Sequence, residues 1–317
     1  MDSLTNNILA FSKIKGIGPA FIKKNLIQIH EFLGSADSLF NHFPKIDRSE
    51  FEYNLNISEA ILEDAEKFGI TVISILDDIY PKNLFEIKDP PPVIFVRGNL
   101  KNLDKCIAII GTRKSTPLGQ KIASKIGEYF SHNWSICNGL VEGIDKYSIT
   151  HDNEVYPSVT GVLSGGLNFS KTSSKVTQEL AEKVLSKDGL ILSEFEPNQK
   201  EDQFSGSKAS RIQAGLSSAL MLVQSSLDGG SKYTIKAFSE LNRVLGIVEY
   251  KGNTEFETSD SFEANRLIIL EKENGVAKMI QSKTSQNLKF KEIIKISKRE
   301  EYQYLEKAIR RQNSLFG

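Results

Sequence analysis

The stretch that decides the fold is Cys106-Ile107-Ala108-Ile109-Ile110, followed by Gly111-Thr112-Arg113-Lys114-Ser115-Thr116-Pro117-Leu118-Gly119. Five consecutive apolar residues are typical of a strand that is covered on both faces of a sheet. The glycine allows the chain to turn sharply, and the amphipathic run 118–130 predicts a helix. We therefore expect a strand, a tight turn and a helix, with the turn at the N-terminus of the helix.

The residues of this turn favour the binding of an anion. Gly111 leaves backbone N–H groups exposed, Thr112 and Ser115 add hydroxyl donors, and Arg113 and Lys114 add positive charge next to a helix N-terminus. The spacing matches neither G-x-G-x-x-G nor a Walker A loop, which argues against a dinucleotide or a nucleoside triphosphate. A planar guanidinium instead suits a phosphodiester. The alternative is a surface loop with ordinary basic residues.

The region from Lys105 to Val248 alternates short apolar runs with longer amphipathic ones, which predicts parallel β-α-β units. The expected strands are Cys106–Ile110, Trp134–Cys137, Val159–Leu163, Leu190–Ser193, Ala219–Val223 and Leu245–Val248. The expected helices are Leu118–Phe130, Ile144–Asp152, Lys175–Ser186, Lys208–Ser217 and Tyr233–Leu241. The predicted fold class is α/β, with an extended Rossmann-like, doubly wound and mostly parallel sheet. Ligands on such sheets bind beyond the carboxyl ends of the strands.

Glycines recur after several of these predicted strands. They lie at Gly139 and Gly143, at Gly165-Gly166, in Ala214-Gly215-Leu216 and in Asp228-Gly229-Gly230-Ser231. If these sites share one edge of the sheet, they leave a crevice in which the backbone can approach a sugar-phosphate chain closely. Each site alone could be only a tight turn.

The N-terminal residues predict a small helical domain. Two apolar series at helical spacing lie between Leu4 and Leu33, on either side of Gly16-Ile17-Gly18-Pro19, and Ile46–Phe68 is an acidic, helical stretch. The turn has the pattern of a helix-hairpin-helix, also known as SAM-like, motif. It could bind a phosphate with help from Lys13, Lys15, Lys23 and Lys24, or it could be a packing module with a solvated lysine face.

Composition shifts divide the chain into three predicted parts. A proline-rich, linker-like segment, residues 77–98, indicates that a domain boundary lies nearby. The predicted parts are an N-terminal helical domain (residues 1–70) and the Rossmann-like domain (residues 71–280). Residues 281–317 are expected to form a basic, helical tail. Within it, Lys289–Arg311 carries eight Lys or Arg and four Asp or Glu, and predicts a short mixed element followed by a helix.

The overall composition excludes several classes of protein. Lys+Arg and Asp+Glu are both 40, so bulk positive charge does not drive nucleic-acid binding, although a local basic groove remains possible. Cys106 and Cys137 lie in apolar runs and are expected to be buried free thiols. We find neither a secretory signal nor an apolar run that could span a membrane, and we expect a cytoplasmic protein.

Residues that could catalyse a reaction are few. The four histidines show no metal spacing with the cysteines, and neither a nucleophile elbow nor a convincing pair of carboxylates is present. Asp145 is interpreted as a structural cap, with a hydroxyl partner of a ligand as the alternative. We therefore expect no metal or cofactor, and a binding protein rather than an enzyme.

Taken in order, the motifs resemble those of the DprA/Smf family. The resemblance covers roughly Leu4 to Ile280 and rests on a series of blocks. They are Tyr80-Pro81 with Leu84, Pro90 to Gly98, Gly111-Thr112-Arg113 with Ser115 and Gly119, Asn138 to Asp145, Gly166-Leu167, Leu192-Ser193-Glu194, Ala209 to Ser217, and Gly230-Ser231 with Thr234.

The resemblance implies an extended Rossmann domain that binds single-stranded DNA without strong sequence preference. It also implies a homodimer that hands the DNA to a RecA-type recombinase during natural transformation. By this likeness the DNA would be bound by Gly111, Thr112, Arg113, Lys114, Ser115, Gly139, Gly143, Gly165, Gly166, Lys171, Lys208 and Arg211. This site requires Arg113 and Arg211 to face the same crevice.

Several positions depart from the family pattern. Ala209 and Ser210 replace the first arginine and the asparagine of an Arg-Asn-Arg block, Asn138 replaces a serine, and Gln224 replaces a glutamate. The Val-Pro-Gly strand end of the family is replaced by Val248-Glu249-Tyr250. Losing one phosphate contact should weaken DNA binding and its salt dependence, which Lys208 could partly offset.

Two other functions stay open. The first is a nucleotide-metabolite sensor or processing enzyme on a related sheet, as in the lysine-decarboxylase-like group. The second is a structural component of a bacterial mobile-element or defence system, in which the pocket has degenerated.

Overall fold

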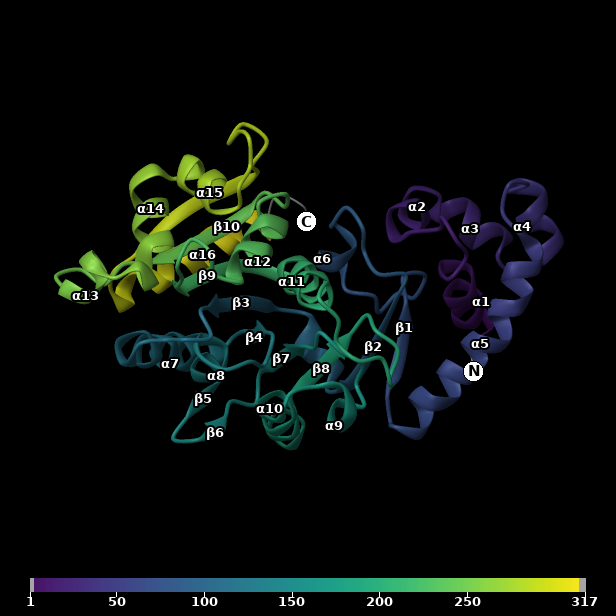
Figure 1. The fold of residues 1–317 in the computed structure, drawn as a ribbon, viewed down its shortest axis with the longest axis horizontal. Helices are drawn as coiled ribbons and strands as arrows, with labels where there is room; N and C mark the ends of the chain where they lie inside the picture. Colours follow the sequence, from purple (N-terminus) through teal and green to yellow (C-terminus); the bar gives the residue numbers. More distant parts are fainter. Residues whose placement is uncertain (1–2, 314–317) are drawn as a thin grey trace.

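The computed structural model describes residues 3–313, and its central feature is a nine-stranded sheet with the order β1-β2-β8-β7-β4-β3-β9-β10-β11 (Figure 1). The strands are β1 Thr71–Ser74, β2 Val93–Gly98, β3 Cys106–Gly111, β4 Ser135–Asn138, β7 Val159–Val162, β8 Leu190–Ser193, β9 Ser217–Gln224, β10 Arg243–Val248 and β11 Phe290–Ile296. The pairs β1·β2 and β2·β8 are antiparallel, and the other pairs of this sheet are parallel. This confirms the predicted fold class.

Helices cover both faces of the sheet. The longer ones in this region are α7 Pro117–Ser131, α8 Ile144–Ile149, α10 Lys175–Ser186, α11 Ser205–Leu216, α12 Ser231–Phe238, α14 Glu263–Glu271, α15 Glu273–Met279 and α16 Tyr302–Asn313. Shorter elements are α6 Lys82–Phe85, η1 Leu100–Leu103, α9 Phe169–Thr172, α13 Thr254–Thr258, η2 Asp260–Phe262 and η3 Arg299–Glu301. Figure 1 shows α7 and α8 on one side of the sheet, and α12, α14 and α15 on the other.

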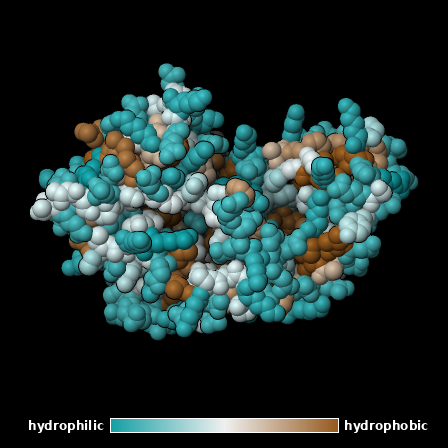
Figure 2. All heavy atoms as spheres, viewed as in Figure 1, coloured by the Kyte–Doolittle hydropathy of each residue, from teal (hydrophilic) through white to brown (hydrophobic). Residues whose placement is uncertain are grey.

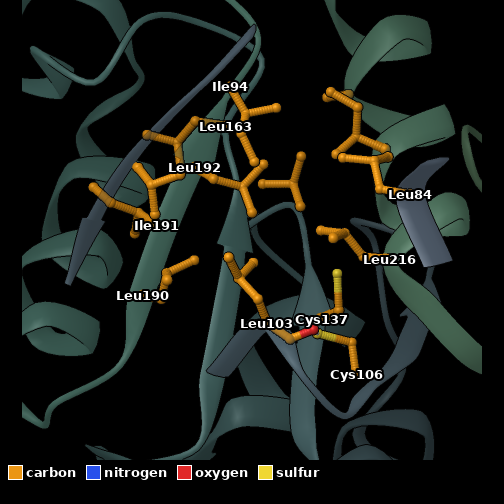
Figure 3. Packing of buried hydrophobic residues seen from close by; sticks show 14 of the residues in the cluster. Leu84, Ile94, Leu103, Cys106, Cys137, Leu163, Leu190, Ile191, Leu192 and Leu216 are labelled. Carbon is orange, nitrogen blue, oxygen red and sulfur yellow. The ribbon is translucent and has the colours of Figure 1, made fainter. Parts of the chain in front are cut away.

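The central strands alternate between two hydrophobic clusters, as expected for a doubly wound sheet. Along β3, Ile107 and Ile109 pack into the cluster that contains α7, whereas Ala108 and Ile110 pack into the cluster that contains α12 and α14. Cys106 and Cys137 are free and buried, which confirms their predicted role as core thiols, and Figure 3 shows them among Leu103 and Leu216. Burial raises the pKa of the Cys106 thiol to about 12.

The predicted helix Ile144–Asp152 is shorter than expected. It ends at Ile149, and residues 150–155 form a small hairpin of β5 Thr150–His151 and β6 Glu154–Val155. Asp152 and Asn153 both adopt positive φ angles, 48° and 66°, and turn the chain between these strands. Asp and Asn tolerate this conformation better than most residues, so Asp152-Asn153 is a turn signal that the helical pattern concealed.

The N-terminal residues form five helices, α1 Ser3–Ser12, α2 Pro19–Lys24, α3 Leu26–Phe32, α4 Ala36–His42 and α5 Arg48–Lys67. The second predicted helix is broken at Asn25, and α4 was not predicted. Two lysines of the hairpin contact the rest of the chain. Lys13 pairs with Glu196, and Lys23 donates to the backbone carbonyl of Ile87 at 2.7 Å. These contacts favour the packing interpretation of the hairpin.

The C-terminal segment contributes to the sheet. Its strand β11 pairs in parallel with β10, and α16 packs over β10 and β9. The predicted mixed element and helix are therefore present as β11 and α16. The division into residues 1–70, 71–280 and 281–317 stays a prediction, and its outer segments include residues 1–2 and 314–317, which lie outside the described residues. Within residues 3–313, none of the helices combines the length and the apolar character that crossing a membrane needs.

Candidate nucleic-acid interface

A pocket of about 660 Å³ opens at the carboxyl ends of β3, β4 and β7. It lies between the turns that follow these strands, α11 and the first turn of α12. The surface in Figure 2 is largely hydrophilic, and a notch separates the N-terminal helices from the part that carries α12, α14 and α15. The pocket is lined by Ile110, Gly111, Thr112, Arg113, Lys114, Gly139, Val141, Asp145, Val162, Ser164, Gln203, Phe204, Gly206, Ser207, Ala209, Ser210, Gln213, Gly230, Ser231, Tyr233 and Thr234.

Hydrogen bonds to Gln224, the last residue of β9, anchor the turn after β3. The N–H of Thr112 donates to the carbonyl of Gln224 at 2.8 Å, and the N–H of Thr116 donates to the side-chain Oε1 of Gln224 at 3.1 Å. Thr116 also caps α7 by accepting from the N–H of Gly119 at 3.1 Å. Because both ends of the turn are anchored, the exposed side chains of Arg113 and Lys114 are presented at the pocket next to a helix N-terminus.

The turn after β4 supports the first turn. Gly143 has φ +83°, and a Cβ at this position would lie 2.2 Å from the carbonyl oxygen of Thr112. The next residue, Ile144, donates its N–H to the same oxygen at 3.1 Å. Only glycine allows this close approach of the two turns, so Gly143 shapes the pocket from behind rather than lining it.

Asp145 lies at the floor of the pocket. Its side-chain Oδ2 accepts from the N–H of Gly139 at 2.8 Å, and the residue is 6% exposed. Burial raises the pKa of this carboxyl to about 7, against the opposing effects of the Gly139 N–H, the positive charge of Arg113 and the backbone of Val141. The carboxylate thus caps the turn, and it also belongs to the surface that a ligand would meet.

Helix α11 presents one face to the pocket, and other residues of the helix lie on faces that point away from it. Gly206, Ala209, Ser210 and Gln213 follow helical spacing and line the pocket. On one of these faces, the Lys208 ammonium lies 5.4 Å from the centre of the Phe195 ring. The positions where the resemblance predicts an arginine and an asparagine, Ala209 and Ser210, are therefore pocket positions.

Arg211 also lies away from the pocket and is held by two carboxylates. Its Nη2 lies 2.7 Å from Oε2 of Glu194, its Nη1 lies 3.1 Å from Oε1 of the same residue, and its Nε lies 3.1 Å from Oδ2 of Asp89. Burial lowers the pKa of Arg211, but the two carboxylates outweigh it and the pKa is raised. This arrangement corrects the expectation that Arg113 and Arg211 face one crevice.

The structure separates the predicted site residues into groups. Gly111, Thr112, Arg113, Lys114 and Gly139 line the pocket. Ser115 follows the first turn, where its carbonyl accepts from Gln120 at 3.2 Å. Gly165 and Gly166 pack against the backbone of Thr172 and of Glu196 and Pro197, and Lys171 lies on α9. Gly215 lies near the end of α11, just before β9 begins, and packs against Leu84 and Ile87. It therefore lies at the amino end of its strand, on the edge of the sheet opposite to the pocket.

Sequence reasoning missed several residues of the pocket. The spacing 206, 209, 210 and 213 on a predicted helix was the signal that could have found Gln213. The aromatic side chains at the rim, Phe204 and Tyr233, are 59% and 49% exposed, and they come from two different elements. Nothing local in the sequence indicates that they meet at one opening.

The fold and this site define a Rossmann-like α/β protein with a pocket at the carboxyl edge of its sheet, which Arg113 and Lys114 line. The sequence model of the family "DNA recombination-mediator protein A" matches residues 53–290. The chain therefore belongs to the DNA recombination-mediator protein A family, which is the DprA/Smf family of the motifs above.

Individual relatives agree with this assignment. Protein Smf of Synechocystis sp. is 29% identical over 251 residues, which are 74% of this chain and 62% of that protein. DNA processing protein DprA of Bacillus subtilis is 32% identical over 169 residues, 52% of this chain and 56% of that protein. The matches thus span only 56% and 62% of the length of these two relatives.

Two solved structures share the fold. The crystal structure of Streptococcus pneumoniae DNA processing protein A superposes with a TM-score of 0.67 at 23% identity, over 86% of this chain and 93% of that chain. DNA processing protein A of Helicobacter pylori, whose structure is described for its single-stranded DNA binding mode, gives a TM-score of 0.54 at 22% identity, over 67% and 96%. At these identities the comparison shows the fold alone.

Proposed function

We propose that this chain binds single-stranded DNA in the pocket at the carboxyl edge of the sheet, as a DNA-processing protein of recombination. The observation that carries the proposal is the meeting of Arg113 and Lys114 with the exposed rings of Phe204 and Tyr233 at one opening. Backbone amides and cations bind phosphates, while aromatic faces stack on bases of any sequence. Family membership and the DNA binding named for the Helicobacter pylori relative support the same function.

The proposed interface differs from the one expected from sequence. Gly111, Thr112, Arg113, Lys114 and Gly139 would contact the strand. Arg211 and Gly143 would hold the elements that form the pocket. From the family we also propose a homodimer that presents the strand to a RecA-type recombinase, and a role in binding rather than catalysis.

The test is the binding of a labelled oligonucleotide, followed by fluorescence anisotropy at several salt concentrations. Arg113→Ala should weaken binding about tenfold and reduce the salt slope by about one unit, because one phosphate contact is lost. Lys208→Ala is the matched control, since it removes a cation from a face of α11 that points away from the pocket. Equal losses in both variants, or the absence of binding at low salt, would refute the proposal.

The volume of the pocket and its buried Asp145 also suit a free nucleotide, which keeps a nucleotide sensor as a second candidate. A thermal-shift panel separates the two functions. A large increase in Tm with a mononucleotide and none with an oligonucleotide would favour the sensor.

A further inference from the structure

A second pocket lies on the face of the sheet that α7 and α16 cover. It has a volume of about 310 Å³ and opens at the carboxyl ends of β10 and β11, which lie beyond β9 in the sheet. None of the described residues that line it also lines the pocket of the candidate interface. The second pocket is therefore a separate site, which DNA binding at the first does not explain.

The floor of the second pocket is mainly aliphatic. Val248 and Ile296, the last residues of β10 and β11, are 3% and 2% exposed, and Ile122 of α7 is half-buried. Tyr302 of α16 also lines the pocket, but its ring is buried against that of Tyr129, with 5.0 Å between the ring centres. A nucleobase needs a free aromatic face on which to stack. This floor suits an aliphatic side chain better than a base.

The rim of the second pocket is positively charged. Lys125 of α7, Lys298 and Arg299 are exposed, and none of the three forms an ion pair among the described residues. The guanidinium carbon of Arg299 lies 6.0 Å from the centre of the Tyr129 ring. The carboxylate of Glu128 also lines the pocket, so the rim keeps an excess of positive charge. An anionic ligand would lower the repulsion among these three cations.

Two carboxylates next to these cations are already engaged by other groups. Glu249 lines the second pocket, but it accepts from the hydroxyl of Ser297 and lies 3.2 Å from the ammonium of Lys295. Glu301 accepts from the backbone N–H of Lys298 at 3.1 Å, which leaves the ammonium of that lysine unpaired. The protein thus uses its own carboxylates elsewhere and leaves the rim cations for a ligand.

One wall of the second pocket depends on a departure from the family pattern. This chain has Val248-Glu249-Tyr250 where the family has Val-Pro-Gly. The N–H of Glu249 donates to the carbonyl of Ile296 at 2.8 Å and so joins the ends of β10 and β11. Proline has no N–H and could not form this bond. The join between the two strand ends is therefore a property of this chain's own sequence.

We propose that the second pocket binds an acidic segment of a partner protein, with one aliphatic side chain of that segment inserted between α7 and the ends of β10 and β11. Carboxylates of the segment would pair with Lys125, Lys298 and Arg299, and this charge complementarity gives specificity. A volume of about 310 Å³ is at the lower end of the range for ligand pockets. It accepts one side chain of an extended segment and excludes a folded domain.

A labelled peptide tests the inference directly. The probe is Gly-Asp-Glu-Asp-Leu-Asp-Glu-Asp-Gly, and its binding to the full chain is measured by fluorescence anisotropy at low salt. The wild type should bind this peptide, and replacing the peptide's leucine by serine should weaken binding about tenfold, because the buried aliphatic side chain is lost. Equal affinity for both peptides, or no binding of the leucine peptide, would overturn the inference.

Charge reversal shows whether the peptide binds at the second pocket. Lys125→Glu should weaken binding of the leucine peptide about tenfold, since it replaces an attraction by a repulsion. Lys121→Glu is the matched control, because Lys121 is exposed on the same helix and does not line the pocket. It should bind the peptide as the wild type does. Equal losses in the two variants would indicate bulk charge and would overturn the inference.

Two further measurements separate the alternatives. Lys125→Glu and Lys121→Glu should bind oligo-dT equally, and a loss confined to Lys125→Glu would make the second pocket part of the nucleic-acid interface and overturn the inference. Ile122→Trp places a larger side chain in the pocket and should remove the preference for the leucine peptide over the serine peptide. A preserved preference would place the leucine elsewhere and would also overturn the inference.

Discussion

Arg113 and Arg211 belong to the same predicted site, yet the structure places them in different environments. Arg113 is exposed on an anchored turn at the pocket, whereas the Arg211 side chain is 15% exposed and bound by Glu194 and Asp89. An arginine that binds a phosphate must not already be paired with a carboxylate of the protein, whereas one paired with a largely buried carboxylate such as Glu194 stabilises the fold. The difference shows that a basic residue of a binding motif can stabilise the fold without contacting the ligand.

The largest expected effect separates the two arginines by stability. Arg211→Ala should lower the free energy of unfolding by about 3–5 kcal/mol, because it leaves the largely buried Glu194 without its partner. Arg113→Ala, at an exposed position, should change stability by less than about 0.5 kcal/mol. Urea unfolding of both variants measures the difference. Similar stabilities for the two variants would show that Arg211 does not stabilise the fold more than Arg113 does.

The next effect concerns the turn that supports Arg113. Gly143→Ala should cost about 3 kcal/mol and weaken DNA binding, because its Cβ would lie 2.2 Å from the oxygen of Thr112 and would displace the turn. Gly252→Ala is a matched control, since Gly252 also has a positive φ of 74° but no heavy atom lies within 4 Å of its added Cβ. It should cost about 1 kcal/mol, from the backbone conformation alone.

If both glycine variants lose the same stability and both bind DNA normally, the two turns do not depend on each other. The position of Arg113 would then not depend on the close approach of Gly143 to Thr112.

A smaller effect contrasts the carboxylates of the two regions. Glu194 is paired with Arg211, whereas Asp145 forms no ion pair among the described residues and has a pKa raised by burial to about 7. Between its ordinary pKa of 3.8 and about 7, the folded chain keeps a proton that the unfolded chain has lost, so this group's contribution to stability falls as the pH rises. Asp145→Asn removes that dependence.

The stability of Asp145→Asn relative to the wild type should therefore be more favourable at pH 8 than at pH 5, by on the order of 2 kcal/mol. Thermal or urea unfolding at both pH values provides the measurement. A relative stability that does not change with pH would show that Asp145 titrates near its ordinary pKa in the folded chain.

The smallest effect restores a cation to the pocket. Ala209 lines the pocket at the position where the family pattern has an arginine, so Ala209→Arg should tighten oligonucleotide binding about fivefold and raise the salt slope by about one unit. Gln286→Arg adds the same charge at an exposed position away from the pocket and serves as the control. An equal gain in both variants would indicate bulk charge instead of a pocket contact.

Local patterns predicted most of the sheet and five of the residues that line the pocket, which are Gly111, Thr112, Arg113, Lys114 and Gly139. The apolar run of β3 and the glycine after it were sufficient for the strand, the turn and the position of Arg113. The same patterns could not show that Gly165 and Gly166 pack against Thr172 and Glu196. A turn needs a glycine both where the backbone lines an open pocket and where it packs closely against another segment. The neighbouring residues do not distinguish these two cases.

The sequence by itself determined the order of the main strands and helices from β3 to β10, because a strand covered on both faces and an amphipathic helix each have a periodicity that short segments display. It also determined that a basic turn precedes α7. Only the tertiary structure decided which cations are free, since Arg211 finds its partners 17 and 122 residues away along the chain. It likewise brought Gln213 opposite Asp145 across Gly139, because helix α11 and the turn after β4 meet only when the sheet is assembled.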